Sequence, residues 1–226
     1  MIPLKVSLVL RRNMNMINDT GKRIHQEAHD LFMQYGLKSV SMDDISSKMG
    51  ISKKTIYQFY TDKEQLVAEV VSQIINQNQQ NCDEDIAQSE NAIHEIFLAI
   101  DQMSKLFQAM NPSILFDLHK YYPQAYKIFV AHKNDFVYNK IKQNLLRGIK
   151  DGMYRGDINT EIISRFRVES IIMPFIPEFQ SALKVKLASI AEELSTHFLF
   201  GVVNEKYYPL INKYIKTRAK KSLTNV

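Results

Sequence analysis

The sequence is poor in residues that interrupt helices or cross-link chains. Only 7 of its 226 residues are Gly and 6 are Pro, and no useful stretch alternates polar and apolar side chains as a strand would. Long helices with few turns are therefore expected, in an all-α protein. The single cysteine, Cys82, excludes an intramolecular disulfide and a zinc site built from several cysteines.

Long uncharged apolar runs and a cleavable signal peptide are also missing. The apolar run near the N-terminus is too short to span a bilayer, and it is followed by Arg11 and Arg12 instead of a small-residue cleavage site. We therefore expect a soluble, cytoplasmic protein with no membrane partner.

Acidic side chains are absent from residues 51–61, and positive charge is concentrated in the same part of the chain. Residues 1–61 hold nine Lys or Arg and five Asp or Glu, a balance of +4, whereas residues 62–226 hold twenty and nineteen, a balance of +1. Because phosphate binding releases counterions from a nucleic acid, this excess of positive charge favours a nucleic-acid partner for the N-terminal part.

Two short amphipathic segments, residues 42–49 and 53–60, are separated by the tripeptide Gly-Ile-Ser at 50–52. A helix, a Gly-containing turn and a second helix form the helix-turn-helix pattern, whose second helix enters the major groove of DNA. The spacing therefore predicts a DNA-binding head.

Capping residues mark the ends of these segments. Ser41 and Asp44 form a capping box for the first helix, and Ser52 is a suitable N-cap for the second. Gly50 can take the left-handed conformation that ends a helix, and Thr61 is expected to cap a third helix.

The run from residue 36 to residue 66 closely resembles the DNA-binding region of the tetracycline-repressor (TetR) family. The matching elements are Gly36, Ser41-Met42, Ile45, Gly50-Ile51-Ser52, Thr55-Ile56-Tyr57, Phe59-Tyr60, Lys63-Glu64 and Leu66. The sequence departs from the family at Lys54, where many members have Gly, and at Gln58, where many have His or another aromatic residue. Both positions face DNA in the family, so the departures concern which base sequence is read.

The resemblance implies an N-terminal three-helix helix-turn-helix domain and a larger C-terminal helical domain for ligand binding and dimerisation. Lys and hydroxyl side chains suit phosphates, whereas Gln pairs with adenine and Lys with guanine. The predicted DNA-binding residues are Ser41, Asp43, Ser52, Lys53, Lys54, Thr55, Tyr57, Gln58, Tyr60 and Lys63.

The expected divisions are a flexible arm or mis-called start at 1–19, the helix-turn-helix domain at 20–65, the ligand-binding and dimerisation domain at 66–218, and a disordered tail at 219–226. The true start is left open between Met1, Met14 and Met16. The polar run 76–85 is expected to be a flexible break. The expected long helices are 21–35, 93–110, 113–121, 124–150, 160–173 and 183–203, with a final helix at 207–216.

The C-terminal domain is rich in large, deformable apolar side chains. Most of them are expected to fill the core, but the resemblance implies a ligand cavity in which a few polar groups orient the ligand. The candidate ligand-binding residues are Phe97, Met103, Phe107, Phe116, His119, Tyr122, Tyr126, Phe129, Phe166 and Met173.

The resemblance also implies a homodimer that pairs through the last two long helices, here 160–173 and 183–203. The predicted dimerisation residues are Ile190, Leu194, His197, Phe198 and Gly201. Pro174 and Pro177 leave the end of the first of these helices open.

No catalytic constellation is recognisable: the sequence has no Gly-rich phosphate loop, no HExxH motif and no Cys–His dyad. No cofactor or metal is expected, since His25 and His29 have no evident third ligand. We therefore predict a sequence-specific regulator that binds operator DNA as a repressor and releases it when a small apolar or amphipathic effector binds. The alternatives are a helical-bundle enzyme and an architectural protein that coats DNA without sequence preference.

Overall fold

The computed structural model describes residues 4–183 and 185–224, and it gives side chains for residues 19–179, 181–183 and 185–219. Within these ranges the chain forms helices and no named strand, apart from one isolated bridge between Tyr154 and Val203. The prediction of an all-α protein is confirmed. None of the helices described is long and apolar enough to cross a membrane.

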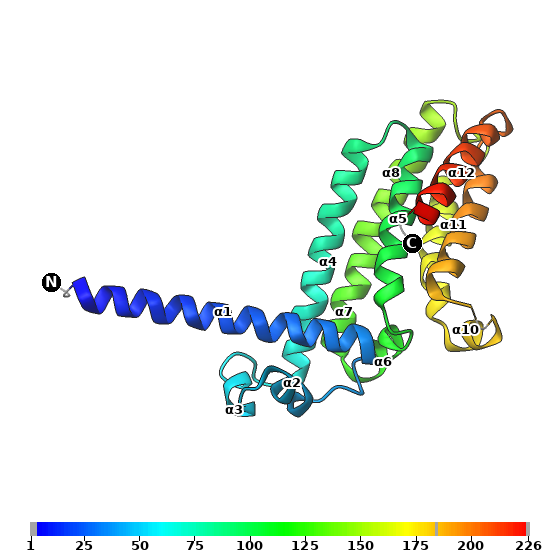
Figure 1. Cartoon of the computed structure of the whole chain (residues 1–226). Helices are drawn as coiled ribbons and strands as arrows, with labels where there is room; N and C mark the ends of the chain where they lie inside the picture. The colour runs from blue at the N-terminus through cyan, green and yellow to red at the C-terminus, as the bar shows by residue number, and fades with distance from the viewer. Residues whose placement is uncertain (1–3, 184, 225–226) are drawn as a thin grey trace. The chain divides into compact units, whose positions relative to one another are not determined.

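Figure 1 shows the order of the helices along the chain. Their bounds are α1 (Leu4–Tyr35), α2 (Met42–Met49), α3 (Lys53–Ile56), α4 (Lys63–Gln88), α5 (Ala92–Ala109), α6 (Ile114–Tyr121), α7 (Pro123–Ala131), α8 (Tyr138–Lys150), α9 (Thr160–Ile172), α10 (Pro177–Leu183), α11 (Leu187–Val202) and α12 (Tyr208–Thr224). A π-helical segment, His132–Val137, joins α7 to α8, and short 3₁₀ turns occupy Met173–Phe175 and Glu205–Tyr207.

The chain divides into two compact units. Unit 1 comprises the residues up to Ile74 together with Asn111–Ile128, and unit 2 comprises Ile75–Met110 together with the residues from Phe129 onward. The expected boundary near residue 65 did not include α6, which belongs with the N-terminal helices.

Unit 1 is built around the inner faces of α1, α2 and α3. Ile24, Ile45 and Ile56 are fully buried there, as their helical spacing predicts. Helix α6 joins this unit through backbone hydrogen bonds: the Asn111 amide donates to the Met33 carbonyl at 2.7 Å, and the Lys38 amide donates to Asp117 Oδ2 at 2.9 Å.

Unit 2 has its core between α5, α8, α9 and α11. Phe97, Leu145 and Leu199 are almost completely buried there. Gly148 in α8 allows a close approach, since a Cβ atom at this position would lie 2.2 Å from the Tyr154 ring. The Tyr154 hydroxyl donates to the Ala92 carbonyl at 2.9 Å and closes the end of this core.

Several helix ends differ from the expectations. Helix α1 already begins at Leu4, whereas residues 1–19 were expected to be a flexible arm or a mis-called start. Helix α4 continues through the polar run 76–85 to Gln88, where a flexible break was expected. Neither stretch contains Gly or Pro after Pro3, and in α4 the amide pair Gln77–Asn81, four residues apart at 2.9 Å, supports the helix.

The C-terminal elements also differ in detail. The 160–173 helix ends at Ile172, because Pro174 and Pro177 start a 3₁₀ turn and the separate helix α10. Helix α12 extends to Thr224, so most of the expected tail 219–226 is helical, and residues 225–226 lie outside the described part.

Candidate nucleic-acid interface

The capping box of α2 forms as its sequence predicts. The Asp44 amide donates to Ser41 Oγ at 3.1 Å, and the Ser41 amide donates back to Asp44 Oδ2 at 2.7 Å. These hydrogen bonds hold the pKa of the Asp44 carboxyl below its ordinary value. The start of α2 is therefore fixed by reciprocal bonds between side chain and backbone.

Gly50 ends α2 and turns the chain toward α3. Its φ of 65° lies in the left-handed region, and the Ile51 amide donates to the Ser46 carbonyl at 3.0 Å, as in a Schellman-type ending. Ser52 then caps α3 by accepting from the Thr55 amide at 3.1 Å. The turn predicted from Gly-Ile-Ser is thus present with both of its caps.

Helix α3 is shorter than the expected segment 53–60. It ends at Ile56, and the chain continues as a tight turn in which the Phe59 amide donates to the Ile56 carbonyl at 2.9 Å. Aromatic and β-branched residues favour helices only weakly, and the Tyr60 ring is drawn into the core of unit 1, where it is 5% exposed.

The third cap lies one residue later than expected. Asp62 Oδ1 accepts from the Gln65 amide at 2.8 Å, so Asp62 caps α4. Thr61 instead donates both its amide and its hydroxyl to Gln65 Oε1. Either arrangement starts α4 at the same place, so the position of α3 is unaffected.

The outer surface of residues 53–58 carries polar side chains that form no hydrogen bond or ion pair with other described side chains. Lys54 and Gln58 are exposed, and within the described side chains neither has a hydrogen-bond or ion-pair partner. Tyr57 is 45% exposed beside them. These are the three side chains best placed to reach base edges and phosphates.

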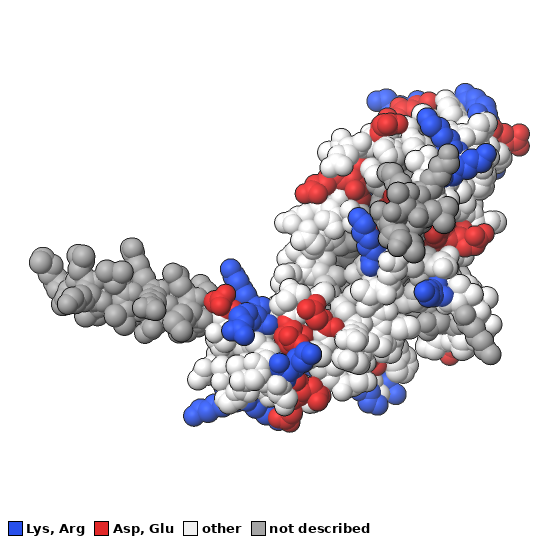
Figure 2. Space-filling view, in the orientation of Figure 1, with Lys and Arg blue, Asp and Glu red and all other residues white. Residues whose placement is uncertain are grey.

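Other predicted contacts are engaged within unit 1. The Lys53 ammonium pairs with Asp43 Oδ2 at 2.9 Å, and this hydrogen bond raises the pKa of Lys53. The Ser52 and Thr55 hydroxyls bond to each other at 2.9 Å. Figure 2 shows basic atoms at the lower edge of the molecule, where Figure 1 places α3, with acidic atoms next to them.

Tyr60 and Lys63 point away from the exposed surface of α3. Burial raises the pKa of Tyr60 to about 12. The Lys63 ammonium donates to the Leu37 carbonyl and lies 5.4 Å from the centre of the Tyr122 ring, and burial lowers its pKa. A DNA contact by Lys63 stays a prediction, and it requires the ammonium to leave the Leu37 carbonyl.

The candidate ligand-binding residues divide between the two units. Those in unit 1 are Phe116, His119, Tyr122 and Tyr126, and those in unit 2 are Phe97, Met103, Phe107, Phe129, Phe166 and Met173. Their environments differ widely. Phe97 is a core residue at 2% exposure, whereas Phe116 and Phe166 are 44% and 53% exposed.

Four of these residues have clear structural partners. The Tyr122 hydroxyl donates to the Leu37 carbonyl at 3.2 Å. The His119 ring lies 4.7 Å from that of Tyr126. Phe107 meets Phe175 edge to face at 4.9 Å.

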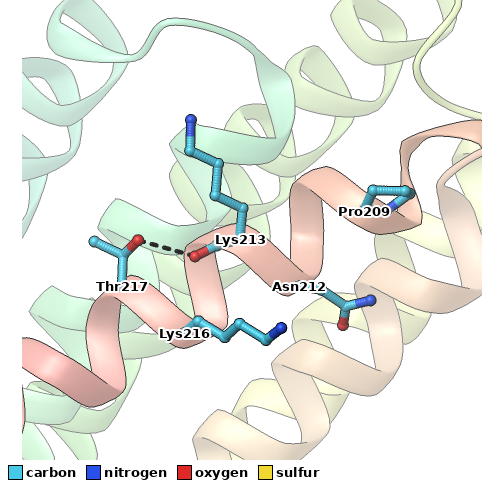
Figure 3. A pocket seen from close by; sticks show the side chains of 5 residues that line it. All are labelled: Pro209, Asn212, Lys213, Lys216 and Thr217. Atoms are coloured by element: carbon cyan, nitrogen blue, oxygen red, sulfur yellow. Dashed lines mark hydrogen bonds between the residues drawn. The ribbon is translucent and has the colours of Figure 1, made fainter.

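An open pocket lies on α12. Its lining residues are Pro209, Asn212, Lys213, Lys216 and Thr217 (Figure 3). The Thr217 hydroxyl is occupied, since it donates to the Lys213 carbonyl at 2.9 Å. The pocket is therefore lined mainly by exposed side chains of one helix and contains no candidate ligand-binding residue.

The predicted dimerisation residues on α11 differ in whether their side chains are buried within the subunit or exposed. Ile190 and Phe198 are buried within the subunit at 6% and 4% exposure. Leu194 is partly buried, whereas His197 and Gly201 are exposed, and no atom lies within 4 Å of a Cβ placed at Gly201. Only the last three are available to a second subunit.

Two large apolar residues are also exposed on α9. Ile162 and Phe166 are 63% and 53% exposed, one helical turn apart. Ile162 was not predicted, and Phe166 was assigned to the ligand. In the sequence, the four-residue spacing of Ile162 and Phe166 indicates that they share one face of a helix, opposite Ser164 and Arg167. This spacing alone does not tell which of the two faces is buried.

Residues 24–70 match the family described as bacterial regulatory proteins, tetR family. An uncharacterised HTH-type transcriptional regulator of Bacillus subtilis (strain 168), YvaF, is 26% identical over 188 residues, which are 82% of this chain and 96% of that protein. A TetR-family transcriptional regulator from Agrobacterium tumefaciens superposes with a TM-score of 0.70 at 18% identity, covering 83% of this chain and 100% of the other. The regulator FadR from Bacillus subtilis, in complex with stearoyl-CoA, gives a TM-score of 0.62 at 15% identity, covering 79% and 97%.

Proposed function

Because this chain is a transcriptional regulator of the TetR family, we propose that it binds one operator sequence as a homodimer and represses the adjacent gene until an effector releases it. Its relatives are regulators and not enzymes. Membership of the TetR family does not specify which side chains read DNA, how two subunits pair, or what kind of effector acts.

The observation that carries the DNA-binding proposal is the pair of unpaired polar side chains at Lys54 and Gln58. Lys54 projects from α3 and Gln58 from the tight turn that follows it, while Ser52 caps the start of α3 and Gly50 ends the helix before it. Polar groups held on a rigid scaffold without internal partners are suited to base edges, where Gln58 pairs with adenine and Lys54 with guanine.

Homodimer formation is supported by the apolar surface on α9 and α11. Ile162 and Phe166 are more than half exposed, and Gly201 on α11 leaves room for a neighbouring helix. Large apolar side chains exposed one turn apart on a helix are candidates for an interaction site, and a two-fold dimer places two heads on half-sites about one helical turn, roughly 10 bp, apart. One head alone contacts too few bases for tight binding.

The effector is proposed to be small and apolar or amphipathic. FadR, whose fold is similar, is described with a bound acyl-CoA, and the C-terminal part of this chain is rich in aromatic side chains. An effector that binds better to one separation of the two heads would shift the population away from the DNA-bound state.

A gel shift at two salt concentrations, with random competitor DNA in excess, tests the DNA-binding proposal. A dimer that neutralises many phosphates should lose affinity steeply as salt rises, yet keep a retarded band on its operator in the presence of competitor. Uniform loss of the band to random DNA would instead indicate an architectural protein without sequence preference.

A further inference from the structure

Helix α9 buries three polar side chains beside the core residue Val168, and it exposes two large apolar ones. Ser164, Arg167 and Ser170 are 0%, 5% and 4% exposed, whereas Ile162 and Phe166 on the other side are 63% and 53% exposed. A helix on the surface of a globular unit normally does the reverse, because apolar burial drives its packing. Val168 packs the inner face of α9 into the core, but apolar packing does not explain the three polar side chains buried beside it.

The Arg167 guanidinium has only neutral partners. Its Nη2 donates to Ser195 Oγ at 2.7 Å, its Nη1 donates to Ser170 Oγ at 3.4 Å, and its centre lies 5.0 Å from that of the Phe198 ring. The two serine hydroxyls donate their own hydrogens to backbone carbonyls, at 2.6 Å for Ser195 and 2.8 Å for Ser170. Their oxygens thus serve as acceptors for the guanidinium, and they supply no negative charge.

No carboxylate among the described side chains forms an ion pair with Arg167. The acidic residues of α9 and α11 that form ion pairs do so with other cations: Glu161 with Lys142, Glu169 with Lys133, and Glu192 with Arg218.

Burial alone lowers the pKa of Arg167 to about 10, with no contribution from an acidic neighbour. A guanidinium has five N–H donors, and only two of them are used here. Burial of a cation without a counter-charge is strongly unfavourable, so a structural role does not account for it.

A second buried polar group on the same side of α9 lacks a partner. The Ser164 hydroxyl is fully buried, and it forms no hydrogen bond. Buried hydroxyls without partners are few in folded proteins, so each needs an explanation, and a bound group that supplies the missing hydrogen bond is one. Ser164 precedes Arg167 by three residues, so both lie on the inner face of one helix.

We propose that Arg167 binds the anionic head group of an amphipathic effector inside unit 2, with a carboxylate as the preferred head. This inference rests on the proposed function, since it names the chemistry of the effector. A guanidinium binds a carboxylate through two parallel hydrogen bonds, and an apolar neighbour such as Phe198 suits an alkyl or aromatic body. The outward face of α9 remains free for the second subunit.

Thermal unfolding of the full chain tests the proposal with defined probes. Hexanoate, decanoate and tetradecanoate are each compared with the alcohol of the same length, and decyl phosphate tests whether a phosphate head replaces the carboxylate. We expect at least one carboxylate to raise the melting temperature of the wild type by roughly 5–10 °C at a hundredfold excess over its Kd, well above its alcohol.

The variant Arg167→Met decides whether this residue is responsible. It should abolish the difference between carboxylate and alcohol, and it should raise the melting temperature without ligand, because it removes an unpaired buried charge. The exposed neighbour Arg165, changed to Met, is the matched control and should keep the difference. A lower melting temperature for Arg167→Met without ligand, or equal effects of acid and alcohol on the wild type, would overturn the proposal.

DNA binding separates this inference from the proposed function. Arg167→Met without ligand should bind the operator as the wild type does, since Arg167 lies in unit 2. A variant that loses operator binding without ligand would show Arg167 to be structural, and the inference would fail while the proposed function stands. Absence of a specific site for the wild type would refute the proposed function, and carboxylate binding would still be measurable by unfolding.

Discussion

Helices α8 and α9 are neighbours in unit 2 with 13 residues each. They differ in how completely their buried polar side chains are hydrogen-bonded and charge-balanced. In α8 the buried amide of Asn144 is bonded at both ends: its Nδ2 donates to the Ala92 carbonyl at 3.0 Å, and its Oδ1 lies 2.9 Å from the Tyr154 hydroxyl, whose single hydrogen it shares with the Ala92 carbonyl. In α9 the buried guanidinium of Arg167 has no counter-charge, and the hydroxyl of Ser164 has no partner.

A polar residue can be buried either because it specifies the packing of the core or because it binds a ligand. The Asn144 network ties α8 to the start of α5 and to the turn after α8, so it specifies the core. The polar groups of α9 reach Ser195 of α11, but they leave the guanidinium without a counter-charge and the Ser164 hydroxyl without a partner, and the outer side of α9 exposes Ile162 and Phe166 among charged residues. A helix with this reversed pattern is suited to a ligand on its inner side and to a second subunit on its outer side.

The largest expected effect comes from breaking the outer face of α9. Phe166→Glu places a carboxylate on a residue that is 53% exposed, so unit 2 should fold while the subunits fail to pair. Operator affinity should then fall by roughly 100-fold or more, because one head contacts too few bases. Light scattering and fluorescence anisotropy measure the two effects.

The matched control is Gln143→Glu on the exposed side of α8, which should leave the dimer and the affinity unchanged. On α11, Gly201→Arg should act like Phe166→Glu, because nothing within the subunit obstructs the new side chain. Gly156→Arg adds the same side chain in similarly open space and serves as its control. A stable dimer of Gly201→Arg with normal operator affinity would place the interface elsewhere.

The second prediction breaks the satisfied network of α8. Asn144→Leu leaves the Tyr154 hydroxyl with one partner fewer and introduces a branched side chain at a position that is 3% exposed. We expect a loss of about 2–4 kcal/mol in the free energy of unfolding, opposite in sign to the effect of Arg167→Met. Urea unfolding of both variants measures the pair, and equal signs would remove the distinction between the two helices.

Gln58 is an exposed polar side chain without a hydrogen-bond partner among the described side chains. Gln58→Ala should cost on the order of 1–3 kcal/mol on the cognate site and relax preference at one base pair. Competition binding with single-base variants of the operator measures this. If affinity for cognate and random DNA falls equally, Gln58 contacts only the backbone.

The smallest expected effect is a pH dependence from Glu95, which accepts from Arg147 at 3.1 Å beside the Asn144 network. Burial raises the pKa of Glu95 above its ordinary value, despite opposing bonds from Asn144 and Arg147. A raised carboxyl pKa gives stability that is present below the unfolded pKa and lost as pH rises through the folded value.

The wild type should therefore lose some stability relative to Glu95→Gln as the pH rises above the ordinary pKa of a Glu carboxyl, about 4.3. Urea unfolding of both proteins across this range compares their slopes. Parallel slopes would show that Glu95 has an ordinary pKa in the folded protein.

The head could be predicted from the sequence because its signals are local. Ser41, Asp44, Gly50 and Ser52 act on backbone groups within a few residues, so their spacing predicts the caps and the turn that the structure contains. The end of α3 was missed because it depends on burial of Tyr60 in the core, which spacing does not reveal.

The C-terminal domain expected at 66–218 was predicted less well, because its contacts join residues that are far apart in the sequence. The association of α6 with the N-terminal helices rests on bonds such as that from the Lys38 amide to Asp117, 79 residues away. Phe166 was assigned to a ligand pocket because aromatic residues are usually buried, but α9 turns it outward. Which face of a helix is buried depends on its neighbours, and periodicity alone leaves that choice open.

The central claim is that two copies of this chain read a specific DNA sequence through α3. Footprinting on the DNA upstream of its own gene, in the presence of excess random DNA, tests it most directly. The wild type should protect two half-sites about one helical turn apart, and Gly201→Arg should protect neither at the same concentration. Protection by the wild type that is uniform along the DNA, or absent, would contradict the claim.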